Sequence, residues 1–443
     1  MKTIVINECE GFSIPDVFTF DLNQGQVKDC TGCWTCWWKT PGRCIYKDLN
    51  EFYHQYITAD KVVFFASVSK GFVSGKIKTL FDRMIPLYLP YTSYKTGESM
   101  HVPRYEKYPD IEFYYQGKFE TPTGREIFED YIHRVFYQFH SSNISVKPIE
   151  DYMEKNIREN TEEKTENKID TAEDIINQRE STLKDKQQSN LDKNTNRSNT
   201  KSEARNKTIN KSIHKNTNMT IDNSMDKSMN TIILNGSPKG NSNKSNSQIF
   251  ANHFVKNMDE PCEIRCIADE DYKGLAEYVR KFDTVIMILP LYIHAMPGIV
   301  MKFIEELNAV DIERKNIGFI VQAGFIETAQ HKYLHRYFEN LAGQLNYNYL
   351  GTVSKGEAAG IYMYPRMFKK VLRRITDLGR AYQKTGTFDT EIVEKLSSPY
   401  ELSKFKVWLL ELVNKVGLGN IGWHKVLRDN NALDKRLDKP FSR

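Results

Sequence analysis

A long polar segment divides this chain into two parts and limits what each part can fold into. Residues 151–230 contain no Gly, Pro or Cys, and Tyr152 is their only aromatic residue. Such a composition cannot bury enough apolar surface to offset the conformational entropy lost on folding. We therefore expect 151–229 to be a low-complexity, disordered linker, with helix formers in its first part. Acids are interspersed among its lysines, which argues for a tether and against nucleic-acid contact.

Both flanking parts have the pattern of parallel α/β structure. In the second part, the expected strands 284–289 and 317–322 are free of polar residues except at one end, Thr284 and Gln322, and are separated by amphipathic stretches. Runs without polar alternation are typical of strands that are covered on both faces of a parallel sheet. The first part repeats the later portion of this order, with strands expected at 61–66 and 111–116. The sequence thus predicts two doubly wound parallel-sheet domains.

The sharpest local signal in the second part is a polar loop between its first strand and the helix that follows. The loop reads Asn235-Gly-Ser-Pro-Lys-Gly-Asn-Ser-Asn-Lys-Ser-Asn-Ser247. The backbone amides of such a loop and of the next helix N-terminus converge on one point, which suits a phosphate. The loop has neither the P-loop spacing nor the Gly-x-Gly-x-x-Gly of a dinucleotide fold. A plain helix-capping turn is the alternative, since Ser and Asn are good N-caps.

A second loop follows the central strand of the same part. It reads Pro290-Leu-Tyr-Ile-His-Ala-Met-Pro297 and brings an aromatic ring, a thioether and backbone amides to the carboxyl edge of the sheet. Ligands of open α/β sheets bind at this edge, at the topological switch point. We expect a flat heteroaromatic ligand to stack here, with its ring nitrogens meeting main-chain donors.

Together, Asn-Gly-Ser-Pro-x-Gly-Asn-Ser-Asn and Pro-x-Tyr-x-x-x-x-Pro-Gly resemble the NADPH-dependent FMN reductase family of flavodoxin-like proteins. The resemblance covers most of residues 230–380. It implies that the first loop holds the FMN phosphate, that the second flanks the isoalloxazine, and that the loop after the next strand adds a third contact. The residues assigned in this way are Ser237, Lys239, Asn241, Ser242, Asn243 and Ser245 for the phosphate, Pro290, Leu291, Tyr292, Ile293 and His294 for the ring, and Gln322 and Gly324 for the third contact.

Four of the seven cysteines are crowded in the first part, at Cys30, Cys33, Cys36 and Cys44. Four thiolates this close together can ligate one [4Fe–4S] cluster. Zinc is an alternative, because four thiolates satisfy its tetrahedral preference. The spacing resembles the compact motif of iron–sulfur flavoproteins, which are relatives of the same reductases. It also resembles reductases whose similar cysteines hold no metal, so free thiols are the third interpretation.

The first part keeps these cysteines but lacks the phosphate loop. After residues 1–7 the chain runs almost directly to the next expected strand at 17–21, which leaves no first helix. We therefore expect this truncated domain to bind no FMN. Members of the family commonly pair as dimers with each flavin near the subunit boundary, so the tandem is interpreted as a pseudo-dimer within one chain, with a homodimer as the other possibility.

The expected organisation follows from these observations. It consists of a degenerate flavodoxin-like domain with the cysteine cluster at 1–150, the linker at 151–229, a flavodoxin-like FMN-binding domain at 230–390 and a C-terminal helical extension at 391–443. A net charge of +5 without a clustered basic face argues against a nucleic-acid partner. No apolar run reaches the length of a membrane span. The N-terminus has the pattern of a buried strand and not of a signal peptide, so we expect a cytoplasmic protein.

The resemblance implies an FMN-dependent oxidoreductase that passes electrons from NAD(P)H to a quinone, a flavin or another small-molecule or protein acceptor. Flavin chemistry belongs to the cofactor, so no catalytic side chain is predicted. An alternative of another class is a non-enzymatic carrier in which a cluster and FMN relay electrons between protein partners. A third is a protein whose first domain is only a scaffold.

Overall fold

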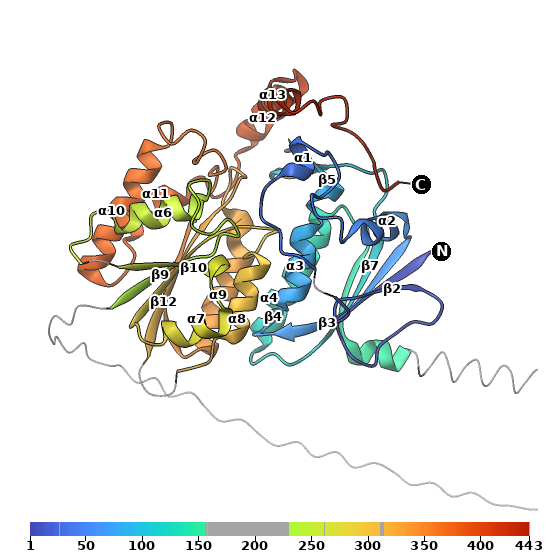
Figure 1. Ribbon diagram of the computed structural model, residues 1–443, viewed down its shortest axis with the longest axis horizontal. Coiled ribbons are helices and arrows are strands. Elements are labelled where there is room, and N and C mark those ends of the chain that lie inside the picture. The colour runs from blue at the N-terminus through green and yellow to red at the C-terminus, as the bar shows by residue number, and fades with distance from the viewer. Residues whose placement is uncertain (26, 156, 158–229, 261, 311–313, 443) are drawn as a thin grey trace, which may run out of the picture. The chain divides into compact units, whose positions relative to one another are not determined.

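The computed structural model describes residues 1–25, 27–155, 157, 230–260, 262–310 and 314–442. The chain divides into two units, and in the first of them residues 1–152 and 230–442 form one compact body. Most of the expected linker, 158–229, lies outside the described residues; residues 149–155, at its beginning, are helical. Figure 1 shows the helices and strands of the first unit.

The first unit contains two parallel sheets with the same strand order. The orders are β2-β1-β3-β7-β8 and β10-β9-β11-β12-β13, and each is 2-1-3-4-5 in its own sequence numbering, the order of flavodoxin-like folds. All neighbours along these two paths are parallel. The predicted fold class is thereby confirmed. The strands are β1 (Thr3–Asn7), β2 (Phe18–Asp21), β3 (Lys61–Ser69), β7 (Asp110–Gln116), β8 (Ile144–Pro148), β9 (Thr231–Asn235), β10 (Glu263–Cys266), β11 (Thr284–Pro290), β12 (Lys315–Gln322) and β13 (Tyr347–Lys355).

Helices cover both faces of the second sheet, which explains its unbroken apolar runs. All seven residues of β11 are buried. One face packs on α7, α8 and α9 and the other on α6, α10 and α11. The bounds of these helices are α6 (Asn246–Val255), α7 (Tyr272–Val279), α8 (Gly298–Glu306), α9 (Lys332–Gln344), α10 (Lys369–Thr385) and α11 (Thr390–Ser397).

The first sheet is covered differently on its two faces. Helices α3 (Gly75–Arg83) and α4 (Pro122–Gln138) pack on one face, and residues 12–17 and 149–152 lie on the other. The described segment between β1 and β2 contains no helix, so the predicted truncation falls on this connection and not on the sheet. Further elements are α1 (Thr35–Trp38), α2 (Asn50–Thr58), β4 (Phe72–Val73) beside β3, and an antiparallel hairpin of β5 (Tyr88–Ser93) and β6 (Met100–Pro103).

The first half of this unit (residues 1–152) and its second half (residues 230–442) meet through α3 and α8, which make reciprocal hydrogen bonds. The Gly75 N–H donates to the Glu305 carboxylate at 2.9 Å, and the Gly298 N–H donates to the Asp82 carboxylate at 2.7 Å. Each carboxylate is the seventh residue after the first glycine of its own helix (75 to 82, and 298 to 305). Such reciprocity is the pattern of an isologous, two-fold contact. Here the contact is made within one chain.

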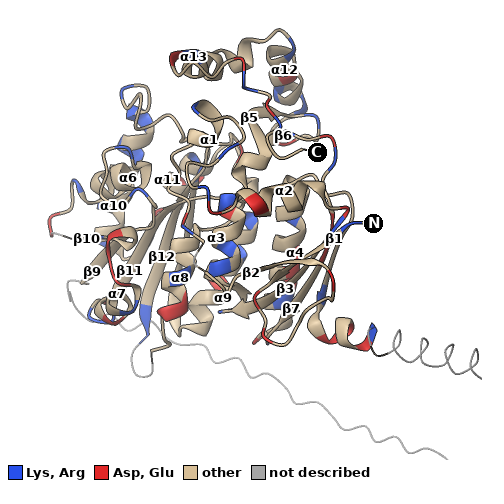
Figure 2. Cartoon of the chain, turned by 45° about the vertical axis from the view of Figure 1, so that its right-hand side comes forward, with Lys and Arg blue, Asp and Glu red and all other residues tan. Residues whose placement is uncertain are grey.

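The C-terminal residues add two further helices and a terminal segment, residues 430–442, that follows them. Helices α12 (Lys404–Lys415) and α13 (Ile421–Asp429) lie at the outer edge beyond α1 and β5 in both views (Figures 1 and 2). The chain then returns to the first half, where Arg104 donates to the Asp438 carbonyl at 2.8 Å and the rings of Tyr53 and Phe441 lie 5.2 Å apart. In the part of the chain that the structure describes, no helix has the length and apolarity needed to cross a membrane.

Candidate functional site

The loop between β9 and α6 is closed by the side chain of Asn235. Its Oδ1 accepts from the Ser237 N–H at 2.9 Å and its Nδ2 donates to the Gly240 carbonyl at 3.0 Å. The Ser247 hydroxyl beside this loop is buried and has no partner among the described residues. Buried polar groups are normally paired. Because Ser247 is fully buried, this hydroxyl is out of reach of a ligand bound outside the loop.

The predicted cofactor residues fall into two groups. Those that line one common cavity are Ser237, Lys239, Pro290, Leu291, Tyr292, Ile293, His294, Gln322 and Gly324. Asn241, Ser242, Asn243 and Ser245 do not line it. Ser245 instead caps α6, where its hydroxyl accepts from the Gln248 N–H at 3.2 Å. Asn241 donates through its N–H to Asp269 at 3.2 Å, and Asn243 is exposed. Ser245 thus caps a helix, as in the alternative interpretation of this loop, whereas Ser237 and Lys239, earlier in the loop, line the cavity.

The loop after β11 forms a tight turn with two residues in the left-handed region. Tyr292 and Ala295 exchange backbone hydrogen bonds of 2.8 and 3.0 Å. Between them, Ile293 and His294 have φ angles of +45° and +60°. This conformation is strained for a β-branched residue, and such strain collects at functional sites. The turn's own hydrogen bonds do not use the amides of the two central residues.

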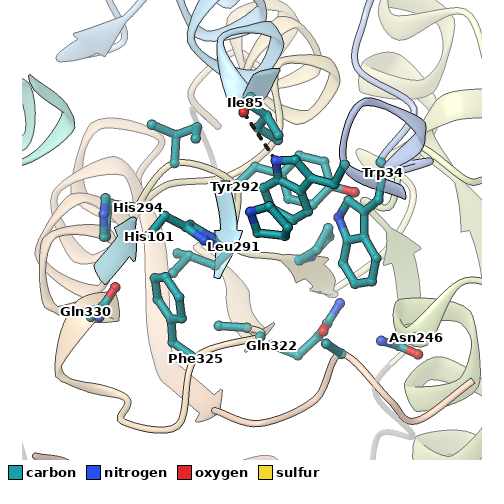
Figure 3. A pocket seen from close by; sticks show the side chains of 18 of the residues that line it. Trp34, Ile85, His101, Asn246, Leu291, Tyr292, His294, Gln322, Phe325 and Gln330 are labelled. Atoms are coloured by element: carbon teal, nitrogen blue, oxygen red, sulfur yellow. Dashed lines mark hydrogen bonds between the residues drawn. The ribbon is translucent and has the colours of Figure 1, made fainter. Parts of the chain in front are cut away.

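Aromatic side chains from the first half and from α13 complete the cavity, which has a volume of about 290 Å³. Trp34, Trp37 and Trp423 form one wall, and the ring of Trp37 lies 5.7 Å from that of Trp423. The Trp37 indole is fixed by its N–H, which donates to the Ile85 carbonyl at 3.3 Å (Figure 3). His101 also lines the cavity and packs 5.0 Å from Trp37. A slot with flat apolar walls suits a planar ring system.

One end of the cavity is polar and holds neutral groups. In Figure 3, His294 and Gln330 lie at the end opposite to Asn246. Burial lowers the pKa of His294 well below its usual value, and Arg134 donates to its Nε2 at 3.3 Å. The same Nε2 also lies 3.2 Å from Gln138 Oε1, and the other ring nitrogen, Nδ1, is buried without a partner in the described chain, as is Gln330 Oε1. An unused ring nitrogen and an unused amide oxygen at this end fit the polar edge of a heteroaromatic ligand.

The four crowded cysteines surround a second, smaller cavity of about 20 Å³. None of the four forms a disulfide, and burial raises the pKa of Cys30 to about 12. Arg83 also lines this cavity; its terminal nitrogens bind Asp48 and the Lys28 carbonyl, while its buried Nε has no described partner. A buried cation with an unused N–H suits an anionic thiolate-ligated group. Among the described side chains, no group of three or more His, Cys, Asp or Glu is arranged to hold a single metal ion.

The two cavities adjoin each other. Trp34 lines both of them. The Tyr292 hydroxyl, from the loop after β11, lies against Gly32 in the middle of the cysteine turn. Lys239, from the loop after β9, places its Nζ 5.6 Å from the Trp34 ring. The sequence did not indicate this proximity, because these residues are two hundred or more positions apart (32 to 292, and 34 to 239).

The first half repeats the asparagine turn but not the Gly-, Ser- and Asn-rich loop that follows it in the second half. Asn7 makes the same two hydrogen bonds to its loop as Asn235 does, to the N–H two residues on and the carbonyl five residues on. Where the second half has Gly236, the first half has Glu8. The Glu8 carboxylate is buried and accepts from the Ser74 hydroxyl. A carboxylate at the start of this loop opposes a phosphate.

Comparisons with known proteins give partial matches. No protein-family model matches the chain. An iron–sulfur flavoprotein of Methanocaldococcus jannaschii is 38% identical over 69 residues, which are 15% of this chain and 34% of that protein. The chain thus matches about a third of the length of this curated relative.

Solved structures with a similar arrangement cover about a third of this chain. An NADPH-quinone reductase from P. pentosaceus is 19% identical, with 35% of this chain and 96% of that chain aligned and a TM-score of 0.27. An FMN-dependent NADH-azoreductase from Bacillus anthracis, in complex with FMN, is 16% identical, with 34% and 99% aligned and a TM-score of 0.26.

Proposed function

We propose that this protein is an FMN-dependent oxidoreductase that transfers electrons from NAD(P)H to a quinone, a flavin or another acceptor. The observation that carries the proposal is that the loops after β9 and β11 open on one aromatic-walled cavity, with unused polar atoms around it. When bound, FMN supplies the acceptance of hydride and the onward transfer of electrons. The remaining task of the chain is to bind, orient and shield that group.

Each part of the cavity has a distinct task in this proposal. Ser237 and Lys239, in the loop after β9, line the cavity and would hold the phosphate of FMN. The amides of Ile293 and His294, together with His294 Nδ1, would meet the polar edge of the ring. Trp37 would cover a ring face and exclude water. Burial lowers the pKa of Lys239, and a phosphate beside it would stabilise its charged form.

The four cysteines would hold a [4Fe–4S] cluster beside the flavin. The cavity they surround and the unused Nε–H of Arg83 support this assignment over free thiols. Since Trp34 lines both cavities, redox groups held in the two would be about one side chain apart. The first half would hold no flavin, because of Glu8, and would serve as the second subunit of a pseudo-dimer.

The adjoining cavities also support the second candidate, a non-enzymatic carrier that relays electrons between protein partners. The two functions differ in the electron donor. Rapid oxidation of NADH or NADPH with a quinone as acceptor supports the enzyme, whereas reduction solely by ferredoxin-like proteins supports the carrier.

The direct test is titration of the apo-protein with FMN, followed by flavin fluorescence. We expect one FMN per chain. Ser237→Asp places a carboxylate at the phosphate end and should weaken FMN binding by about 100-fold or more. Ser237→Ala is the matched control and should weaken it much less. Absence of flavin binding, or two flavins per chain, would contradict the proposal.

A further inference from the structure

Helix α12 presents its apolar stripe to solvent. The stripe consists of Phe405, Trp408, Leu409 and Leu412, together with the C-cap residue Val416. The series 405, 408, 412, 416 and the series 405, 409, 412, 416 both run at the three- and four-residue intervals of one helix face. Phe405 is 70% exposed and Trp408 59% exposed, and no residue of the helix is buried. Amphipathic helices of globular proteins normally turn such a stripe towards the core.

Polar groups hold the opposite face of α12 to the β5–β6 hairpin. The Asn414 side chain donates to the Thr92 carbonyl at 2.7 Å. The Glu411 carboxylate accepts from the Tyr94 N–H at 2.5 Å and from the Ser93 hydroxyl at 3.3 Å. The orientation of the helix is thus fixed by specific hydrogen bonds, and the outward direction of the stripe follows from them.

Lysines flank the stripe on both sides. At 100° per residue, Lys404 and Lys415 fall beside one edge of the stripe and Lys406 beside the other. Glu411 is the one acidic residue in α12, and it bonds inward. The outer side of the helix therefore combines aromatic and aliphatic side chains with lysines that no acidic residue of α12 opposes. This is the composition of helices that lie in the interface of an anionic membrane.

Exposed apolar side chains continue from α12 towards the opening of the large cavity. Leu418 and Ile421 are exposed just after the helix, and Trp423, two residues further on, is half-buried and lines the cavity. The half-buried Tyr362 also lines the cavity, and the next residues, Met363 and Tyr364, are exposed. The apolar surface and the rim of the cavity are thus joined through α13 and this loop.

We propose that the outer face of α12 docks on the surface of an anionic lipid bilayer. A second copy of the chain is a poorer occupant, because a two-fold contact through the stripe would bring lysines against lysines without an acid to oppose them. Anionic headgroups complement the flanking cations, while Trp408 and Leu412 enter the boundary of the acyl chains. This proposal goes beyond the redox function and does not depend on it.

The test is sedimentation of the full-length protein with vesicles. We expect it to pellet with phosphatidylcholine vesicles that contain about one third phosphatidylglycerol, and to remain in solution with phosphatidylcholine alone or in about 1 M salt. Leu412→Glu, at a position 42% exposed, should abolish binding. Tyr137→Glu, on α4 at a position 41% exposed, is the matched control and should bind like the wild type.

A second variant and a second signal guard against misfolding. Joint replacement of Lys404, Lys406 and Lys415 by Gln leaves the stripe intact and should weaken binding to anionic vesicles by about 100-fold. Brominated lipids should quench the fluorescence of the wild type more than that of Trp408→Phe.

Equal binding to neutral vesicles, or no binding to either kind, overturns the proposal. If the wild type is instead a dimer in solution and Leu412→Glu a monomer, the face belongs to a second copy, and the proposal is also overturned. Vesicle binding is measured whether or not the protein contains flavin, so its failure is distinct from failure of the redox proposal.

Discussion

The hydroxyl of Tyr292, in the loop after β11, lies against Gly32, between Cys30 and Cys33 of the first half. This close approach is possible only because residue 32 has no side chain. Gly32 also has a φ of +61°, which L side chains rarely adopt. Two independent constraints therefore select glycine at this point. The contact joins the two cavities that we assign to redox groups.

Gly32→Ala should destabilise the protein through both constraints. The left-handed backbone costs about 1–2 kcal/mol, and overlap with the Tyr292 hydroxyl adds about 1–3 kcal/mol. Gly11→Ala is the control, since Gly11 has a φ of +81° but nothing within 4 Å of the added carbon. Tyr292→Phe removes the overlapping oxygen and should recover part of the loss in the double variant. Urea unfolding measures all three, and equal losses at positions 11 and 32 would show that the contact is unimportant.

Asp82→Ala should be among the most destabilising changes at the contact between the halves. Asp82 and Lys78 form a fully buried ion pair on α3. Removal of one partner leaves an uncompensated buried charge, which costs about 3–5 kcal/mol. The double variant Asp82→Leu with Lys78→Met should be more stable than Asp82→Ala, although the Gly298 N–H then loses its acceptor. The free energies of unfolding in urea of the single and double variants are compared. A double variant as unstable as Asp82→Ala would show that the buried charge is not the cause of the loss.

Cys44→Ser should lower the iron and acid-labile sulfide of anaerobically purified protein. The wild type is expected to carry about four irons per chain. Cys9→Ser is the control, because Cys9 is a buried thiol that packs beside Ser67 and does not line the cysteine cavity. Zinc in place of iron would support the zinc interpretation, and a wild type without metal would leave free thiols.

His101→Phe should make stability less sensitive to acid. Burial between aromatic rings lowers the pKa of His101 to about 4. Between pH 6.5 and 4 the unfolded chain binds a proton at this residue and the folded chain does not, so stability falls as the pH falls. The substitution removes up to about 1.4 kcal/mol per pH unit of that slope. Urea unfolding at several pH values measures it, with His54→Gln, at an exposed position, as the control. An unchanged slope would mean that His101 is protonated in the folded protein.

The fold was predictable because burial leaves a direct trace in the sequence. Strand β11 is apolar after Thr284 and buried throughout, since helices cover both faces of its sheet. The placement of Ser237 beside Tyr292 followed from the same logic, because the carboxyl ends of neighbouring parallel strands meet at one edge. Local chemistry along the chain was enough for these two conclusions.

Other features of the site depend on competition and on long-range packing. Whether Ser245 faces a ligand or caps its own helix is a choice between two acceptable hydrogen bonds, and the structure shows the cap. The wall formed by Trp34 and Trp423 unites residues from opposite ends of the chain, so no local pattern reports it. The direction of α12 is likewise fixed by the contact of Asn414 with a distant hairpin and not by its own periodicity.

The reciprocal bonds of Gly75 and Gly298 have a consequence for how the site assembles. In a dimer of separate chains, each pocket loses its opposite wall on dilution, because association follows mass action. Here both walls belong to one covalent chain, so closure of the pocket is unimolecular and independent of protein concentration. Each half also has its own sequence. The first half therefore carries Glu8 at the position where the second half keeps Gly236.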